Sequence, residues 1–240
     1  MRKPISMRIF SIIFLFFSSV LSCFSQQKVE GAIIAGASYY RGDLNEGNIV
    51  FDLVHPNFGA AIRYNVMPSF IIKLQAMFGS IAGDDKYTPN EAVRGAYFNN
   101  SYFSIGIAGE YLPLRQARFD GIGDFKKTWS PYLSFGIEFL QSADEVKCRY
   151  CGINNPNSLP EKDDKDTFIG LPFGLGARVD FHPNISIGAE VILQATFSDY
   201  LDGISKLGND QRNDWIIGAN FYVSYFFARS EPDFNFSTKK

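Results

Sequence analysis

Two cysteines three positions apart have the spacing that redox and zinc sites use. Cys148 and Cys151 form a Cys-Arg-Tyr-Cys motif within a polar stretch rich in Asn and Pro. A dithiol redox site needs such a motif at the start of a helix, and a structural zinc site needs two further ligands. Neither context is visible here. In an oxidising compartment we therefore expect a disulfide that braces this loop.

Nucleophilic hydrolysis is the second chemistry to consider, because Ser, His and Asp all occur in the loops. The chain has two histidines, His55 and His182, and no spacing around them resembles a catalytic constellation. A glycine-rich phosphate loop and a metal-ligand helix are also missing. We predict no catalytic site, no metal and no cofactor. An acyltransferase or hydrolase remains the enzyme alternative.

Charged residues also recur at alternate positions of otherwise apolar segments. Four are acidic and three are basic: Glu30, Arg63, Lys73, Glu110, Glu138, Arg178 and Glu190. If the apolar face of such a segment meets lipid, these charges must pair with one another or contact water on the other face. We expect a salt-bridge network that fills the lumen of a narrow barrel, which argues against a general porin.

The elements that must hold these charges are eight segments in which apolar and polar residues alternate. No helical pattern remains that could cover so much sheet, so the apolar face must meet lipid. The 24 Phe and 12 Tyr suit lipid-facing and interfacial positions. We predict an all-β fold, an eight-stranded antiparallel transmembrane β-barrel of the outer-membrane type. The predicted strands are 29–40, 58–66, 70–79, 102–111, 129–140, 168–181, 185–197 and 215–227.

An export signal precedes the strands. Residues 1–25 combine Arg2, Lys3 and Arg8 with an apolar stretch that is too short to span a bilayer. We expect cleavage after Ser25, with lipidation of Cys23 as an open alternative. This leaves a barrel at 26–228 and a periplasmic tail at 229–240. Removing three basic residues from 23 leaves 20 against 25 acidic ones, which argues against nucleic acid as a partner.

The connections between strands predict the orientation. Residues 67–69 and 182–184 are tight turns, whereas 41–57, 80–101, 141–167 and 198–214 are long and polar. Short turns of such barrels face the periplasm and long loops face outward. The connection at 113–128 should be short but has 16 residues. It is our candidate contact for a periplasmic partner, through Arg115, Arg118, Lys126 and Lys127.

Two strand-end motifs carry a family resemblance. The first strand closes with Tyr40, Gly42 and Asp43, and the seventh with Asp199, Tyr200, Leu201 and Asp202. Together and in this order they resemble the PorG-type outer-membrane barrels of the Bacteroidota, which belong to the type IX secretion system. The resemblance implies a role in protein transport and gliding motility, in which the barrel ties a periplasmic ring that includes a lipoprotein to the membrane.

From the residues alone, we expect these motifs to pack the loops and Tyr39, Tyr40 and Tyr200 to join the aromatic girdle. A surface barrel for ligand binding or membrane integrity is the non-enzymatic alternative.

Overall fold

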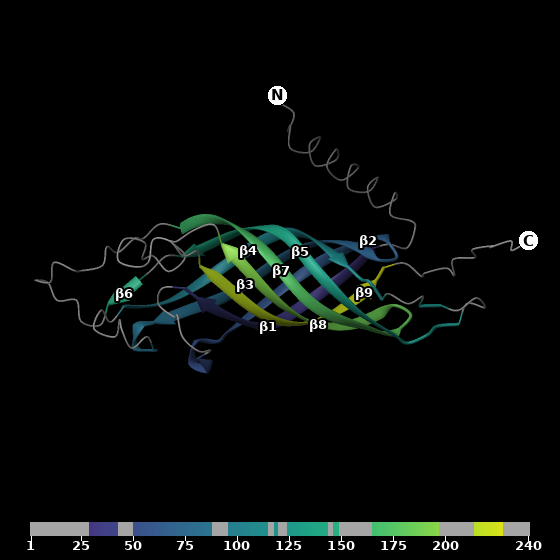
Figure 1. The fold of residues 1–240 in the computed structure, drawn as a ribbon, viewed down its shortest axis with the longest axis horizontal. Helices are drawn as coiled ribbons and strands as arrows, with labels where there is room; N and C mark the ends of the chain where they lie inside the picture. Colours follow the sequence, from purple (N-terminus) through teal and green to yellow (C-terminus); the bar gives the residue numbers. More distant parts are fainter. Residues whose placement is uncertain are drawn as a thin grey trace, which may run out of the picture.

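The chain forms a closed barrel of eight long strands, seen along its flank in Figure 1. The computed structural model describes residues 29–42, 50–87, 96–114, 118–119, 124–143, 146–148, 165–196 and 214–227. The predicted signal peptide and C-terminal tail lie outside these residues. The barrel strands are β1 (Val29–Arg41), β2 (His55–Met67), β3 (Phe70–Asp84), β4 (Ala96–Tyr111), β5 (Thr128–Ala143), β7 (Lys165–His182), β8 (Ile185–Thr196) and β9 (Trp215–Phe226).

Every barrel strand pairs antiparallel with its neighbours in the sequence, and β1 pairs with β9 to close the cylinder. A closed sheet leaves no unpaired strand edge, which a strand in lipid could not satisfy. This confirms the predicted fold. Three short elements lie outside the eight: η1 (Phe51–Leu53), η2 (Asp85–Tyr87) and β6 (Val146–Cys148), which pairs with the start of β4. In the part of the chain that the structure describes, no helix is long and apolar enough to cross a membrane.

The outer wall is apolar because every second side chain of a strand points away from the lumen. Large hydrophobic side chains are exposed on all eight strands, including Ile33 on β1, Leu175 on β7 and Phe221 on β9. In water, such a surface would be an aggregation site; in a bilayer, it is the lipid contact. Aromatic side chains lie toward both ends of this surface, for example Phe103 and Phe139 at one end and Trp129 and Tyr225 at the other.

The largest extensions of strands beyond their predicted ends lie on the side of the long loops. At the opposite end, β2, β5 and β7 are each longer than predicted by one residue. β3 ends at Asp84 rather than at residue 79, and β4 begins at Ala96 rather than at residue 102. Here the inward positions are apolar. They form a buried cluster inside the barrel: Tyr40, Ile81, Phe98, Tyr102, Leu140, Phe168 and Ile216, which we call the outer core. The prediction missed these extensions because the alternation reverses where the strands leave the lipid: apolar side chains now point inward and polar side chains point outward.

Candidate functional site

The centre of the lumen is filled by ion pairs that join four strands. Lys73 of β3 lies between two carboxylates, with its Nζ 3.2 Å from Oε1 of Glu110 on β4 and 3.1 Å from Oε2 of Glu190 on β8. Arg63 of β2 holds the same Glu110 oxygen through its Nε at 3.2 Å. All four side chains are buried. Since each charge is fully desolvated, losing one partner would leave an uncompensated charge in the barrel.

Two tyrosines complete this central network. The Tyr132 hydroxyl donates a hydrogen bond of 2.9 Å to Glu190 Oε2. The guanidinium carbon of Arg63 lies 3.8 Å from the ring centroid of Tyr222, a cation–π contact. The sequence analysis did not single out either tyrosine, because an aromatic residue in a barrel strand also fits the interfacial girdle. Only their position in the alternation distinguishes them from girdle residues. Tyr132 is an even number of positions from Glu138 on β5, and Tyr222 is an even number of positions from Asn220 on β9, so both side chains point into the lumen.

A second set of ion pairs fills the mouth of the barrel on the side of the tight turns. Arg178 of β7 lies with its Nη1 2.9 Å from Glu30 Oε2 on β1, and with its Nε 2.8 Å from Asp180 Oδ1. Its Nη2 also donates to the hydroxyl of Ser186 on β8 at 2.9 Å. Six of the seven charges predicted from the sequence therefore form two groups, one at the centre of the lumen and one at this mouth, whereas Glu138 has no ion pair among the described residues.

Arg118 occupies the same mouth, which corrects its assignment as an available partner contact. Its Nε lies 3.3 Å from Asp180 Oδ2, and its Nη2 donates to the carbonyl oxygen of Pro183 at 3.0 Å. Its guanidinium stacks on the Phe226 ring at 3.8 Å. The side chain is buried at this opening.

The other basic residues of this connection differ from Arg118. Lys126 and Lys127 are exposed immediately before β5, and Arg115 lies outside the described residues. The Lys126 amide donates to the Arg118 carbonyl at 2.7 Å, and the rings of Phe119 and Phe125 meet edge to face at 5.9 Å. These contacts fix the position of the two exposed lysines relative to the barrel mouth.

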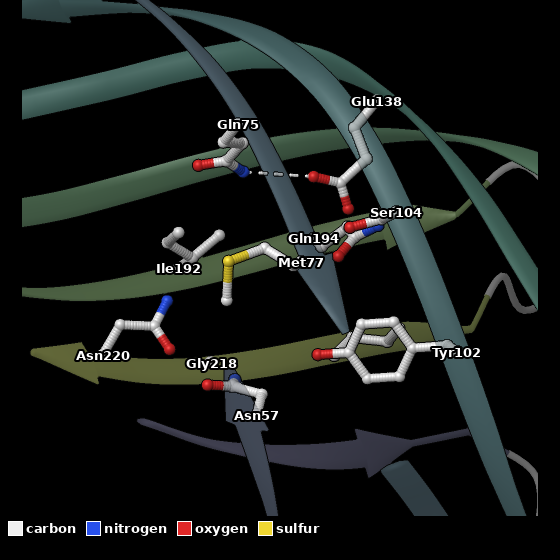
Figure 2. A pocket seen from close by; sticks show the side chains of 11 residues that line it. Asn57, Gln75, Met77, Tyr102, Ser104, Glu138, Ile192, Gln194, Gly218 and Asn220 are labelled. Atoms are coloured by element: carbon white, nitrogen blue, oxygen red, sulfur yellow. Dashed lines mark hydrogen bonds between the residues drawn. The ribbon is translucent and has the colours of Figure 1, made fainter. Parts of the chain in front are cut away.

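On the side of the long loops, the lumen contains a small polar cavity, shown in Figure 2. Its volume is about 30 Å³, and it lies between the central ion pairs and the outer core. Glu138 of β5 is the one carboxylate on its wall, and Gln75 Nε2 donates to Glu138 Oε2 at 3.2 Å. The remaining lining residues are uncharged: Asn57, Gln75, Met77, Tyr102, Ser104, Ile192, Gln194, Ile216, Gly218 and Asn220.

The first family motif closes the rim of the barrel from inside. Tyr40 is fully buried, and its hydroxyl donates to Asp214 Oδ1 at 2.7 Å. A Cβ at Gly42 would overlap both the Tyr40 hydroxyl and Asp214, so this position needs glycine. The expectation that Tyr40 belongs to the girdle is wrong, because its position on β1 points into the outer core. Asp43, Asp199, Tyr200, Leu201 and Asp202 lie outside the described residues.

Residues that suggested chemistry have structural contacts where they are described. The Ser38 hydroxyl donates to the carbonyl oxygens of Ser80 at 2.8 Å and His55 at 3.4 Å. His182 Nδ1 accepts from the Asn184 amide at 3.3 Å. Cys148 ends β6, whereas Cys151 lies outside the described residues, so their disulfide stays a prediction. The described segments contain no group of three or more His, Cys, Asp or Glu residues suited to a metal ion.

Comparison with known proteins supplies a family. Residues 7–235 match the model of a domain of unknown function, DUF6089. The chain belongs to this family. The DUF6089 match extends over almost the whole sequence, including every described strand. No curated protein matches the chain.

Among solved structures, the DUF6089 chain is similar to small outer-membrane barrels. One is Ail, the attachment invasion locus protein of Yersinia pestis, in complex with the heparin analogue sucrose octasulfate. Its sequence is 12% identical and the TM-score is 0.48, and the match covers 84% of this chain and 99% of Ail. Neisserial surface protein A has 14% identity and a TM-score of 0.47, over 83% and 97% of the two chains. The outer-membrane enzyme PagL has 13% identity and a TM-score of 0.39, over 82% and 98%.

Proposed function

We propose that this DUF6089 protein is a non-enzymatic outer-membrane barrel that serves as a structural component of the type IX secretion machinery. In this role it ties a periplasmic ring, which includes a lipoprotein, to the membrane. The motifs that resemble PorG-type barrels motivate the assignment. The structural observation that supports it most is the filled lumen, in which buried ion pairs occupy both the centre and one mouth. A barrel without an open channel acts through its outer wall and its ends.

The outer wall provides the membrane contact. The exposed apolar side chains of all eight strands require lipid around them, and an outer membrane is where closed barrels of this kind reside. In this orientation the tight turns at residues 68–69 and 183–184 face the periplasm, as does the connection that contains Lys126 and Lys127.

The partner contact in this proposal is the pair of exposed lysines. Arg118 anchors their connection to the barrel mouth, so Lys126 and Lys127 are held at a defined place on the periplasmic end. Two fixed positive charges beside a membrane would guide and hold an acidic surface of a periplasmic protein. Arg118 contributes indirectly by fixing this connection in place.

The test is the double substitution Lys126→Ser/Lys127→Ser in the full-length protein, followed by affinity purification of the tagged barrel from outer membranes. We expect normal heat-modifiable migration of the barrel but about tenfold less co-purified ring protein, since losing roughly 1.4 kcal/mol of binding lowers affinity tenfold. Export of secreted proteins should fall in parallel. The matched control is Lys86→Ser, which removes an exposed lysine from η2 at the opposite end.

Two results would contradict this proposal. If the double variant retains its partners and its export while assembling normally, the lysine pair is not the contact. If deletion of the whole protein leaves secretion and gliding unchanged but makes the outer membrane leaky, the barrel serves membrane integrity, which is the alternative function.

A further inference from the structure

The ion pairs of the lumen leave one charge unmatched. Between the periplasmic mouth and the outer core, the described lumen holds five carboxylates and four cationic side chains. The carboxylates are those of Glu30, Glu110, Glu138, Asp180 and Glu190, and the cations are Arg63, Lys73, Arg118 and Arg178. Each of these residues has an ion-pair partner within 3.3 Å with the exception of Glu138. With Glu138 ionised, the filled lumen carries a net charge of −1, located on β5.

The surroundings of Glu138 do not supply the missing positive charge. The residue is buried, and the groups that donate hydrogen bonds to it are neutral, among them the Gln75 amide and the Ser104 hydroxyl. An isolated buried carboxylate is strongly unfavourable unless it is neutralised. A cavity of about 30 Å³ adjoins it, which is enough space for roughly two water-sized particles.

Four buried polar atoms on the cavity wall have no hydrogen-bond partner among the described residues: three are amide oxygens and the fourth is the donor Gln194 Nε2. The three oxygens are Asn57 Oδ1, Gln75 Oε1 and Asn220 Oδ1. They come from β2, β3 and β9. Figure 2 shows Gln75 next to Glu138 at the top of the view, with Asn57 and Asn220 at the bottom. Oxygen acceptors around one negative charge form the ligand chemistry of a hard cation.

We propose that this cavity binds one monovalent alkali cation, Na⁺ or K⁺, next to Glu138. A single positive charge makes the lumen neutral, whereas a divalent ion would reverse its net charge. Divalent sites also use several carboxylates, and this cavity has one. The outer core lies on one side of the cavity and the central ion pairs lie on the other, so the ion is held within the barrel. It completes the ion-pair network that fills the lumen.

The test measures thermal unfolding of the full-length barrel in detergent at constant ionic strength and neutral pH. NaCl or KCl replaces N-methylglucamine chloride, whose cation is too large for the cavity, over about 1 to 100 mM. A ligand that binds only the folded state raises the midpoint, and we expect a saturable rise of at least about 3 °C. Glu138→Gln should remove this rise, because its neutral amide needs no counter-ion.

Two controls keep the test decisive. Asn220→Ala removes one acceptor oxygen without changing charge and should shift the titration to higher cation concentration, which provides a second variant if Glu138→Gln does not assemble. Lys86→Ser, on the outer side of the barrel, should keep the wild-type response. A flat wild-type titration would show that Glu138 is neutralised by a proton instead, and an unchanged cation response in Glu138→Gln would place the ion elsewhere. Either result overturns the proposal.

Discussion

Lys73 is the side chain on which the central ion pairs depend, because it neutralises Glu110 and Glu190 from two other strands. We predict that Lys73→Met lowers the free energy of unfolding by about 3–5 kcal/mol, the usual cost of breaking a buried pair by removing one partner. Urea unfolding of the barrel in lipid vesicles measures this. The double variant Lys73→Met/Glu190→Met should recover part of the loss, since Glu190 is the carboxylate that loses its ion pair, whereas Glu110 keeps Arg63.

A matched substitution separates this effect from the general cost of changing a lysine. Lys126→Met alters an exposed lysine of the periplasmic connection and should change stability by less than about 0.5 kcal/mol. If Lys73→Met is equally mild, the buried ion pairs contribute little to holding the barrel together.

At the scale of the strand, glycines on the inner face make room for the luminal tyrosines. A Cβ at Gly188 would overlap the Tyr222 ring, and one at Gly176 would overlap the Tyr132 ring. We predict that Gly188→Ala destabilises the barrel by about 1–3 kcal/mol, because it displaces the ring on which Arg63 stacks. Gly218→Ala is the control, since its Cβ would meet nothing closer than 3.7 Å. Equal unfolding midpoints of the two variants in urea would contradict the packing argument.

The strands were predictable from the sequence only where they cross lipid, because there the apolar side chains always point outward and the polar ones inward. Ile187, Val191 and Val223 face outward with polar neighbours between them, so β8 and β9 could be recognised at once. At Ile81 and Phe98 the phase is opposite, because the wall now faces water and the interior is apolar. If apolar residues are expected only on the outer face, these residues are assigned to loops, and for this reason β3 and β4 were predicted to be shorter.

The same reasoning explains which parts of the site were predictable. A charge within a lipid-facing pattern must point inward, so seven of the luminal charges could be identified from their positions. Asp180 on β7 has the same inward phase as Arg178 and was missed. Arg118 could not be identified, because it lies in a connection without periodicity, and its place at the mouth depends on Asp180 and Phe226 far away in the sequence. The cavity beside Glu138 depends on side-chain packing among strands, which a sequence pattern does not encode.

For the molecule as a whole, the filled lumen predicts an electrically silent barrel. With buried ion pairs at the centre and a second set at the periplasmic mouth, purified protein in planar bilayers should show no steady conductance. Arg118→Ala opens the mouth but leaves the central pairs in place, so this variant should stay silent as well. Large and stable ion-selective channels from the wild-type protein would show that the lumen is open, and would revive a porin function.

The reversal of the alternation also fixes how high the barrel stands in the bilayer. Above the reversal, Asn99, Ser101 and Gln141 are exposed on the outer wall, and drawing them into hydrocarbon would be unfavourable. Below the lipid belt, Trp129 and Tyr225 oppose displacement in the other direction, since such side chains prefer the headgroup level. The barrel therefore has one axial position. Its tight turns project a set distance from the lipid surface on their side, and a protein bound to them would lie at a constant height above that surface.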